Sequence, residues 1–354
     1  MGRSTIRSSR VRTLLAENRN DLIVLATLLL VVFLLVEQSI RFWMYGADSF
    51  SYRKMDSIGS LRNAGFLQAS SDPGILYELK PDLDSYYKLA DFRTNSRGLR
   101  DREYPLEKPP ATFRVAVIGG SYTMPSGVAL EDAYHSILED RLNRESPGRS
   151  HEFINFGVGG YATKNKLATL RRKVLEYRPD LILFVLDGTK LADETGTKRR
   201  FVPKERETNF FQSFAWQLFL KSPLVASLSN DRESYLEKQR KSLAKLDGEL
   251  QELAEISRAH STPICVVELD HDPSSARLAE AVGDLVRKNG LHFANTVPAF
   301  AGVRFRDSSV DPLDPHPNPA AHRIFAQALY DDLKRQALLG DAAPGDDEAD
   351  PAGP

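Results

Sequence analysis

The chain has 354 residues, enough for one large α/β domain with additional segments or for two small domains. Its 47 basic and 48 acidic residues nearly cancel, so the overall charge gives no reason to expect nucleic acid as a partner. Cys265 is the single cysteine, which excludes an intramolecular disulfide and argues against a cysteine-based zinc site. We expect neither a metal ion nor a cofactor, and the sequence identifies no protein partner.

A long apolar segment lies near the N-terminus. Residues 1–21 form a basic tail, and residues 22–36 are apolar apart from Thr27. Fifteen residues make about 22 Å of helix, and continuing to residue 44 reaches the roughly 30 Å of a bilayer core. We expect an uncleaved transmembrane anchor over residues 22–44, with membrane lipid as its partner. A cleaved secretory signal is the alternative, although no small-residue cleavage site follows Val36.

The charges around this segment predict its orientation. The basic tail places the N-terminus in the cytoplasm and the following domain in the periplasm or another extracytoplasmic space, as in a single-pass inner (cell) membrane protein. Glu37 and Arg41 lie four residues apart at the end of the apolar run, where they can pair with each other or reach the interface. Phe42, Trp43 and Tyr45 can form an aromatic belt there.

Two segments flank the central part of the chain. Residues 46–112 have mixed composition and end in a proline-rich linker, so we expect a small extension packed on the main domain, with strand-like pieces at 75–79 and 86–92. Residues 340–354 are rich in aspartate and proline and predict a disordered acidic tail.

Strand and helix patterns alternate regularly from residue 113 to 337. Predicted buried strands cover 113–118, 152–155, 181–186, 264–269 and 291–294. Predicted helices cover 132–144, 163–177 (with Thr163 as N-cap) and 319–336, together with a mostly helical insertion at 190–260 that contains stretches 210–228 and 234–259. The alternation predicts an α/β fold with a parallel sheet covered on both faces, whose ligands bind at the carboxyl ends of the strands.

A serine follows the first of these strands almost directly. Gly119 and Gly120 end the apolar run, Ser121 comes next, and a helix pattern begins a few residues later. The glycines permit a sharp turn that leaves the hydroxyl at the carboxyl edge of the sheet, where backbone N–H groups favour negative charge. This is a good position for a nucleophile, although a Gly-Gly-Ser sequence by itself is more often an ordinary turn.

Two further turns carry suitable chemistry. The turn at 155–163 contains three glycines whose N–H groups can donate to an oxyanion, unless it is an ordinary glycine-rich turn. Near the C-terminus, Asp314 and His316 lie two residues apart on a proline-braced loop before the last helix. A lone histidine there is more often structural, but a neighbouring carboxylate orients a general base, and Ser121 supplies a group for it to activate.

A second histidine also follows a strand. Asp270, His271 and Asp272 come after the fourth predicted strand and face the same edge of the sheet. They can act as a rival base or a weak metal site. We favour a polar loop at the mouth of the pocket, because three consecutive side chains cannot all converge on one ion.

Taken together, these segments resemble blocks of the SGNH (GDSL-like) hydrolase superfamily in its membrane-anchored bacterial type. VIGGSYT resembles the nucleophile block, with Gly120 where aspartate is commoner, and NFGVGGYAT resembles the block whose glycine amide lines the oxyanion hole, here Gly160. DPHPNPAAHRIFAQAL resembles the block that carries the catalytic acid and histidine, matching Asp314 and His316. The resemblance spans residues 113–336 and implies a three-layer α/β/α fold with a flavodoxin-like parallel sheet.

The third block of the family departs from its usual pattern. The family commonly has an asparagine that donates to the oxyanion, and this position falls on Thr189, followed by Lys190. A threonine hydroxyl can donate one hydrogen bond but has a shorter reach, and loss of an oxyanion donor typically costs about 10²–10³ in rate. The resemblance thus assigns oxyanion or substrate-binding positions to Gly120, Asn155, Gly160 and Thr189.

The mechanism that the resemblance implies is acyl transfer through Ser121. His316 accepts the serine proton and passes it to the leaving group, Asp314 holds the imidazole, and the N–H groups of Ser121 and Gly160 bind the oxyanion. With water as acceptor the protein is an esterase acting on a glycan or small ester. With a sugar hydroxyl as acceptor it is an O-acyltransferase. The altered third block also supports a non-catalytic glycan-binding protein or scaffold.

Overall fold

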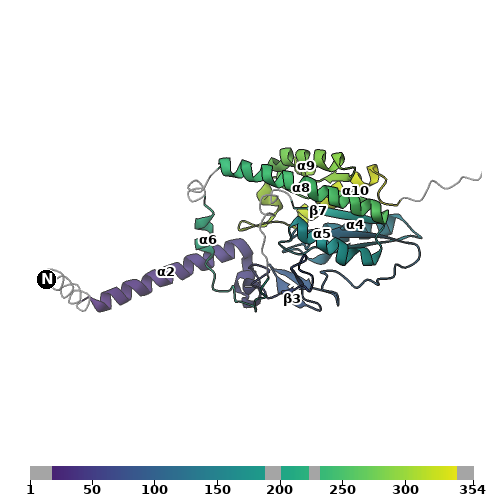
Figure 1. Cartoon of the computed structure of the whole chain (residues 1–354). Helices are drawn as coiled ribbons and strands as arrows, with labels where there is room; N and C mark the ends of the chain where they lie inside the picture. The colour runs from purple at the N-terminus through teal and green to yellow at the C-terminus, as the bar shows by residue number, and fades with distance from the viewer. Residues whose placement is uncertain (1–17, 188–200, 223–231, 341–354) are drawn as a thin grey trace, which may run out of the picture. The chain divides into compact units, whose positions relative to one another are not determined.

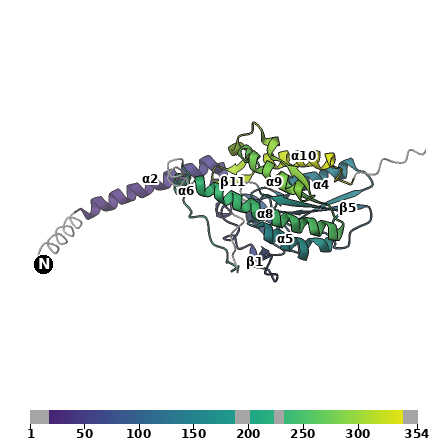
Figure 2. The same cartoon turned by 45° about the horizontal axis from the view of Figure 1, so that its top comes forward.

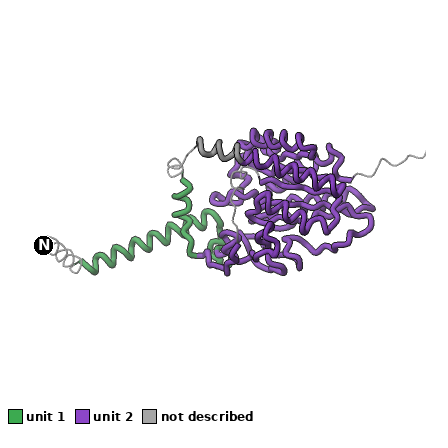
Figure 3. The backbone as a smooth tube through the Cα atoms, viewed as in Figure 1, with its two compact units in different colours: residues 1–55, 211–229 green, residues 56–210, 230–354 purple. Residues whose placement is uncertain are grey.

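The computed structural model describes residues 18–187, 201–222 and 232–340, and for residues 232–241 it describes the backbone only. The chain divides into two compact units (Figure 3). Unit 1 contains residues 1–55 and 211–229, and unit 2 contains residues 56–210 and 230–354. The predicted acidic tail, most of the basic tail and Thr189 lie outside the described residues.

A five-stranded parallel sheet forms the centre of unit 2. Its strands are β5 (Thr112–Ile118), β6 (Ser150–Asn155), β7 (Leu181–Leu186), β8 (Ile264–Glu268) and β9 (His292–Asn295). They lie in the order β6-β5-β7-β8-β9, and each pairs in parallel with its neighbours. This is the doubly wound order of flavodoxin-like folds, so the predicted fold class is confirmed.

Helices cover both faces of this sheet (Figures 1 and 2). One face carries α4 (Tyr134–Glu145) and α10 (Pro319–Arg335), and the other carries α5 (Thr163–Arg172), α8 (Arg232–His260) and α9 (Ala276–Lys288). Along β5, Val115 and Val117 belong to the apolar cluster between the sheet and α4 and α10. Ala116 and Ile118 belong to the cluster between the sheet and α5, α8 and α9. Because successive strand residues point to opposite faces, a strand covered on both sides needs the continuous apolar run of this sequence.

The extension before the sheet is built from two small hairpins. They pair β1 (Leu67–Ala69) with β2 (Tyr77–Leu79), and β3 (Asp84–Tyr87) with β4 (Ala90–Arg93). The predicted strand at 86–92 is therefore wrong. Lys88 (φ 49°) and Leu89 (φ 67°) are both left-handed and form a two-residue turn between β3 and β4. The apolar side of the extension packs on Met124, Val158 and Tyr161, which lie in the turns after β5 and β6.

Other element boundaries also differ from the predictions. The helix expected at 163–177 ends at Arg172, and its N-cap is Ala162 rather than Thr163. The helical segment expected at 190–260 is divided between the units. Its part α6 (Phe214–Leu220) belongs to unit 1, whereas Leu246 and Leu250 of α8 belong to an apolar cluster of the sheet. The second half of α8 is thus a part of the core layer.

Unit 1 is centred on the helix α2 (Arg19–Tyr45), followed by the short helices η1 (Gly46–Phe50) and α3 (Tyr52–Asp56). The large apolar side chains between residues 22 and 36 are 43–64% exposed, and the mean hydropathy of the most apolar part of the helix is 2.5. By length and composition the helix can cross a membrane as a signal anchor or act as a signal sequence. Glu37 Oε1 and Arg41 Nε lie 3.1 Å apart, which realises the pairing alternative.

Candidate active site

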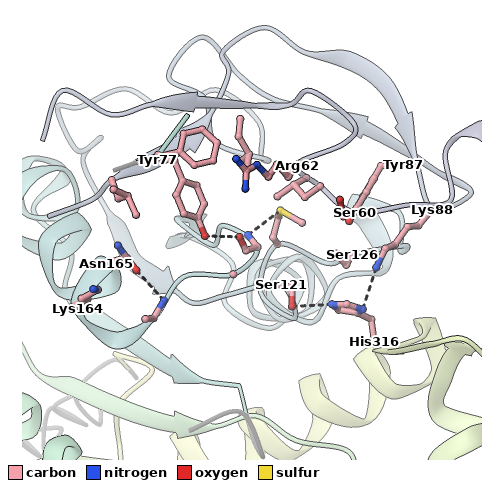
Figure 4. Close-up of a pocket in the computed structure, with 18 residues that line it drawn as sticks. Ser60, Arg62, Tyr77, Tyr87, Lys88, Ser121, Ser126, Lys164, Asn165 and His316 are labelled. Carbon is pink, nitrogen blue, oxygen red and sulfur yellow. Dashed lines mark hydrogen bonds between the residues drawn. The ribbon is translucent and has the colours of Figure 1, made fainter. Parts of the chain in front are cut away.

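Three side chains at the carboxyl edge of the sheet form a hydrogen-bonded series. His316 Nε2 lies 2.9 Å from Ser121 Oγ (Figure 4), and the other ring nitrogen, His316 Nδ1, is hydrogen-bonded to Asp314 Oδ1. The side chains of His316 and Asp314 are 16% and 12% exposed. The structure therefore brings together the three residues predicted to carry the chemistry, although Ser121 and His316 are separated by 195 positions in the chain.

The turn that presents Ser121 needs its glycines for space. A Cβ atom at Gly119 would lie 2.0 Å from Thr123 Oγ1, and one at Gly120 would lie 1.8 Å from Asp187 Oδ2. Asp187 directly follows β7, the strand beside β5. The family more commonly has aspartate at position 120, and here the carboxylate of Asp187 occupies the space beside that position. Gly120 thus shapes the turn, and it does not line the cavity described below.

Asp314 and His316 lie on a hairpin formed by β10 (Ser309–Asp311) and β11 (Asp314–Pro317). The Asp311 carboxylate accepts the N–H of Leu313 at 2.7 Å and that of Asp314 at 2.8 Å, which holds the turn. Asn318 then caps α10 by accepting the N–H of Ala321 at 3.0 Å. The predicted proline-braced loop is therefore a short hairpin, held at its turn by Asp311 and at its end by the Asn318 cap of α10.

Two backbone N–H groups at the cavity are available for an oxyanion. Gly160 has a φ of 81°, a conformation that favours glycine, and it lines the same cavity as Ser121. Within the described part of the chain, neither the Ser121 N–H nor the Gly160 N–H donates to a protein acceptor. Such unpaired donors beside a nucleophile can stabilise the charge that develops on an ester carbonyl oxygen.

Asn155 occupies a different place from the one its assignment suggested. Its side chain is fully buried, with Nδ2 3.1 Å from the carbonyl oxygen of Thr123 and Oδ1 accepting the Gly157 N–H at 2.8 Å. It joins the turn after β5 to the turn after β6. Thr189, the other proposed oxyanion donor, lies outside the described residues, so its role stays a prediction.

The extension adds a residue that the sequence analysis missed. Lys88 Nζ lies 2.6 Å from Asp314 Oδ2 and 3.2 Å from His316 Nδ1, and its side chain is 13% exposed. The left-handed turn that carries Lys88 is held by its N–H, which donates to the carbonyl oxygen of Ser57 at 2.9 Å. The sequence at this turn has no Asn-Gly or Asp-Gly signal, so only the folded chain reveals the contact.

This lysine changes the electrostatics of the acid. Burial alone would raise the pKa of Asp314, but the hydrogen bond and charge of His316 and the charge of Lys88 hold that pKa well below its ordinary value. The carboxylate therefore stays ionised at neutral pH. It can stabilise a protonated His316 while its second oxygen pairs with Lys88.

A second missed residue ties the extension to the nucleophile turn. Arg100 is 1% exposed and donates to the carbonyl oxygens of Met124, Pro125 and Val128 at 2.5–2.7 Å, and to that of Asp91 in β4 at 2.9 Å. Burial lowers the pKa of Arg100 to about 10, so it remains a cation at neutral pH. One guanidinium therefore links the turn after β5 to the hairpin that carries Lys88.

These elements enclose a cavity of about 590 Å³ above Ser121 (Figure 4). Its described lining contains basic but no acidic side chains, together with hydroxyl, amide and aromatic groups. The extension contributes Ser60, Leu61, Arg62, Leu67, Leu76, Tyr77, Tyr87 and Lys88. The main domain contributes Ser121, Met124, Ser126, Gly159, Gly160, Ala162, Lys164, Asn165, Phe201 and His316. The volume is within the range of small-molecule and oligosaccharide sites.

The histidine of the Asp270–Asp272 turn contacts the strand that carries Asp314 and His316. His271 is fully buried, with Nδ1 2.8 Å from Ser308 Oγ and Nε2 3.0 Å from the carbonyl oxygen of Pro315 on β11. It packs on Phe305 with ring centroids 4.5 Å apart. Among the residues that the structure describes, no group of histidine, cysteine and carboxylate side chains is arranged to hold a metal ion.

A serine, an imidazole and a carboxylate in this series, at the edge of a doubly wound sheet, define a site of the serine-hydrolase class. The sequence comparison is more specific. The chain belongs to the GDSL-like Lipase/Acylhydrolase family, whose profile matches residues 117–324. No curated protein matches the sequence.

Solved structures that are similar to this chain include TesA and two esterases. TesA is 16% identical over 63% of this chain and 98% of its own, with a TM-score of 0.43. An acetylxylan esterase, Axe2 from Geobacillus stearothermophilus, solved as a catalytic mutant, is 16% identical over 62% of this chain and 94% of its own, with a TM-score of 0.41. A two-domain esterase active on acetylated mannans is 16% identical over 66% of this chain and 51% of its own, with a TM-score of 0.40.

Proposed function

We propose that this protein is a membrane-anchored, serine-dependent esterase that removes acyl groups from a cell-envelope or secreted polysaccharide. The observation that carries the proposal is the 2.9 Å contact between Ser121 Oγ and His316 Nε2, with Asp314 on the other ring nitrogen. Family membership supports the ester chemistry. The glycan substrate rests on the hydroxyl-rich and aromatic lining of the cavity and on the proposed location outside the cytoplasm.

The proposed reaction has two steps. Ser121 Oγ attacks the ester carbonyl carbon while its proton passes to His316 Nε2, and the N–H groups of Ser121 and Gly160 stabilise the oxyanion. The bond to the leaving alcohol breaks as His316 returns the proton to the departing oxygen, which leaves an acyl-serine. Water then attacks the acyl-serine with His316 as base, releasing the acid and restoring the Ser121 hydroxyl. Asp314 holds the Nδ1 proton and stabilises the imidazolium in both steps.

A second candidate function is O-acyl transfer to a sugar hydroxyl. The residues of the extension that line the cavity over Ser121 favour this alternative, because the cavity has room for an acceptor sugar beside the acyl-serine. The two activities differ only in what attacks the acyl-serine. Product analysis with an acetyl ester donor and a neutral oligosaccharide separates them, since hydrolysis yields free acetate and transfer yields an acetylated sugar.

We also propose that α2 is retained as an anchor. Glu37, Arg41 and Tyr45 are its buried residues, and their partners lie in α6 and the residues just before it. Removal of α2 as a signal peptide would leave these partners exposed. N-terminal sequencing of the mature protein from membranes tests this, because cleavage would give a chain that begins after α2.

The test of the proposed chemistry is labelling of the full chain in detergent with a fluorophosphonate probe, followed by peptide mass spectrometry. We expect the label on Ser121 in the natural protein and in the control Ser274→Ala, which changes an exposed serine. His316→Ala should abolish labelling without unfolding the protein. Labelling that survives Ser121→Ala would overturn Ser121 as the nucleophile. A folded protein that takes no label would move the non-catalytic glycan-binding interpretation to first place.

A further inference from the structure

The end of α2 is clamped to α6 by a buried acidic side chain. Glu37 accepts the N–H groups of Phe214 and Ala215 at 2.8 and 3.1 Å and the hydroxyl of Ser213 at 3.0 Å. These donors form the N-terminus of α6, so one carboxylate satisfies groups that a helix end leaves unpaired. The Glu37 side chain is 8% exposed, and Arg41 is its ion-pair partner.

Arg41 strengthens the same contact. Its guanidinium donates to the carbonyl oxygen of Gln212 at 2.9 Å and lies 5.2 Å from the ring centroid of Phe214. Tyr45 packs edge-on against the same ring at 5.5 Å. Glu37, Arg41 and Tyr45 recur every four residues, so they form a single stripe of α2 that α6 covers. Residues 212–215 thus satisfy both charges of the ion pair.

The other side of α6 is apolar and exposed. Phe211, Trp216, Phe219 and Leu220 are 47–80% exposed, and Trp216 stacks on Phe219 with ring centroids 5.3 Å apart. The seven residues Phe214–Leu220 carry no charge. Exposed aromatic groups also surround the end of α2 and the segment after it, where Phe42, Trp43, Phe50 and Tyr52 are 54–70% exposed. The aromatic groups of both segments belong to unit 1.

We infer that α6 is a second membrane element, lying in the interfacial layer of the bilayer with Trp216 and Phe219 against lipid. The depth follows from Glu37, which lies seven residues, or about 10 Å of helix, before the outer end of the predicted anchor 22–44 and is fixed to the N-terminus of α6. A clamp at that level holds α6 in the outer part of the hydrocarbon core next to the headgroups, where interfacial helices bury their apolar faces. Aromatic side chains with polar edges are stabilised in this layer.

This position in the membrane also explains why Glu37 and Arg41 are paired and covered by protein. A carboxylate and a guanidinium at the edge of the hydrocarbon would be costly if they faced lipid. Residues 212–215 and Arg41 surround the carboxylate, so the pair is satisfied within the protein while the apolar side of α6 meets the membrane. The polypeptide that builds unit 2 would then be tied to the bilayer at residues 211–220 as well as through α2. This inference rests on the proposed anchoring by α2 and is independent of the chemistry of Ser121.

The chain is well suited to a direct test, because Trp43 and Trp216 are its two tryptophans. In Trp43→Phe the fluorescence reports on α6 alone, and in Trp216→Phe it reports on the end of α2. Each full-length variant is reconstituted into phosphatidylcholine vesicles containing brominated lipid, with the bromine atoms either near the headgroup or deep in the acyl chains. Iodide in the aqueous phase quenches tryptophans that are exposed to water, and far-ultraviolet circular dichroism monitors folding of each variant.

For Trp43→Phe we expect quenching that is stronger with shallow than with deep bromine, and protection from iodide. Adding Glu37→Ala should release α6, reduce bromine quenching and admit iodide, whereas Arg323→Gln, on an exposed helix face of unit 2, should change neither. Quenching of Trp216 by iodide alone would overturn the inference, because the helix would then lie in water. Protection from both quenchers would overturn it too, because protein would cover the face. Loss of bromine quenching in Trp216→Phe would instead contradict the anchor.

Discussion

The sheet of unit 2 and the extension of residues 56–111 contribute to one site in different ways. The turn after β5 supplies Ser121, and the β10–β11 hairpin beside the sheet supplies Asp314 and His316. These are the groups that exchange protons or form bonds in the proposed reaction. The extension supplies Lys88, whose charge meets Asp314, and Arg100, which binds the carbonyl oxygens of the nucleophile turn. It also forms one wall of the cavity.

The difference shows that the reacting groups and the groups that hold and tune them come from different parts of the chain. Residues at the carboxyl ends of parallel strands converge because the doubly wound topology brings these ends together. Residues of the extension reach the site through buried cations and left-handed turns that depend on contacts with the rest of the chain. Changes at Ser121, Asp314 or His316 should therefore abolish the reaction. Changes in the extension should alter the stability of the protein and the pH dependence and rate of the reaction.

The largest effect is expected from removal of the proposed base. In His316→Ala, Ser121 loses its base, and kcat for a small acetyl ester should fall by about 10⁴-fold or more. Steady-state turnover of p-nitrophenyl acetate measures this fall. His292→Ala, at the exposed start of β9, is the matched control and should retain the natural rate. A rate for His316→Ala within tenfold of the natural protein would contradict the assigned base.

The next effect concerns the attachment of the extension. Arg100→Met leaves four carbonyl oxygens without their donor, and we expect the free energy of unfolding to fall by about 3 kcal/mol, because buried polar groups without partners are costly. Urea unfolding measures the change. Arg100→Lys should be nearly as damaging, because one ammonium cannot reproduce the guanidinium fork.

Arg102→Met provides the comparison for this experiment. Its guanidinium is 52% exposed and pairs with Glu139, so the loss should be at most about 1 kcal/mol. Equal stabilities of Arg100→Met and Arg102→Met would show that the extension is not held by the buried guanidinium.

A pH-dependent stability should follow from Asp101, which accepts the N–H of Asn155 in β6 at 2.8 Å. Burial raises the pKa of Asp101 to about 7, above its value in the unfolded chain, which is about 3.9. Between these values the folded protein keeps a proton that the unfolded chain releases. Stability from this group is therefore present at low pH and falls as the pH rises toward 7.

The measurement compares Asp101→Asn with the natural protein in urea at pH 5.5 and pH 7. The variant has no proton to release, so the natural protein should lose about 2 kcal/mol relative to it over this interval, which spans about 1.5 pH units. A constant difference between the two proteins would show that Asp101 is ionised throughout, held by its N–H donors.

The smallest expected effect, and the most specific, is that of the lysine at the acid. In Lys88→Met the cation 2.6 Å from Asp314 Oδ2 is removed, so the pKa of Asp314 rises toward its ordinary value and the carboxylate accepts a proton at higher pH. The acid limb of the kcat/KM profile should therefore move to higher pH by about one pH unit.

A second substitution at position 88 shows whether the charge of Lys88 or its packing is responsible for the effect. Lys88→Arg keeps the positive charge and should restore the position of the acid limb, even where the altered geometry lowers the rate. Tyr87, the last residue of β3, precedes Lys88 in the chain. Tyr87→Phe leaves the charges unchanged and should leave the acid limb of the kcat/KM profile in place. A uniform loss of kcat/KM across all pH values in Lys88→Met would mean that Lys88 acts only by packing.

The sequence by itself determined the sheet and the three central residues of the site. The apolar run followed by Gly119 and Gly120 placed Ser121 at a strand end of the parallel sheet, and the proline-braced Asp-x-His before the last helix pointed to Asp314 and His316. The order of strands in the sheet followed from the resemblance to a known family. Local patterns were less reliable in the extension, where the hairpin at 84–93 was predicted as a strand because its turn lacks a glycine signal.

Tertiary structure alone decided the rest. Lys88 and His316 are 228 positions apart, and nothing near Lys88 in the sequence predicts an ion pair with Asp314. Likewise, Asp187 occupies the space beside Gly120 only because β7 pairs with β5, and Asn155 joins two turns rather than lining the cavity. Buried charges choose partners by distance in the folded chain, so these contacts appear only when the elements that carry them are packed.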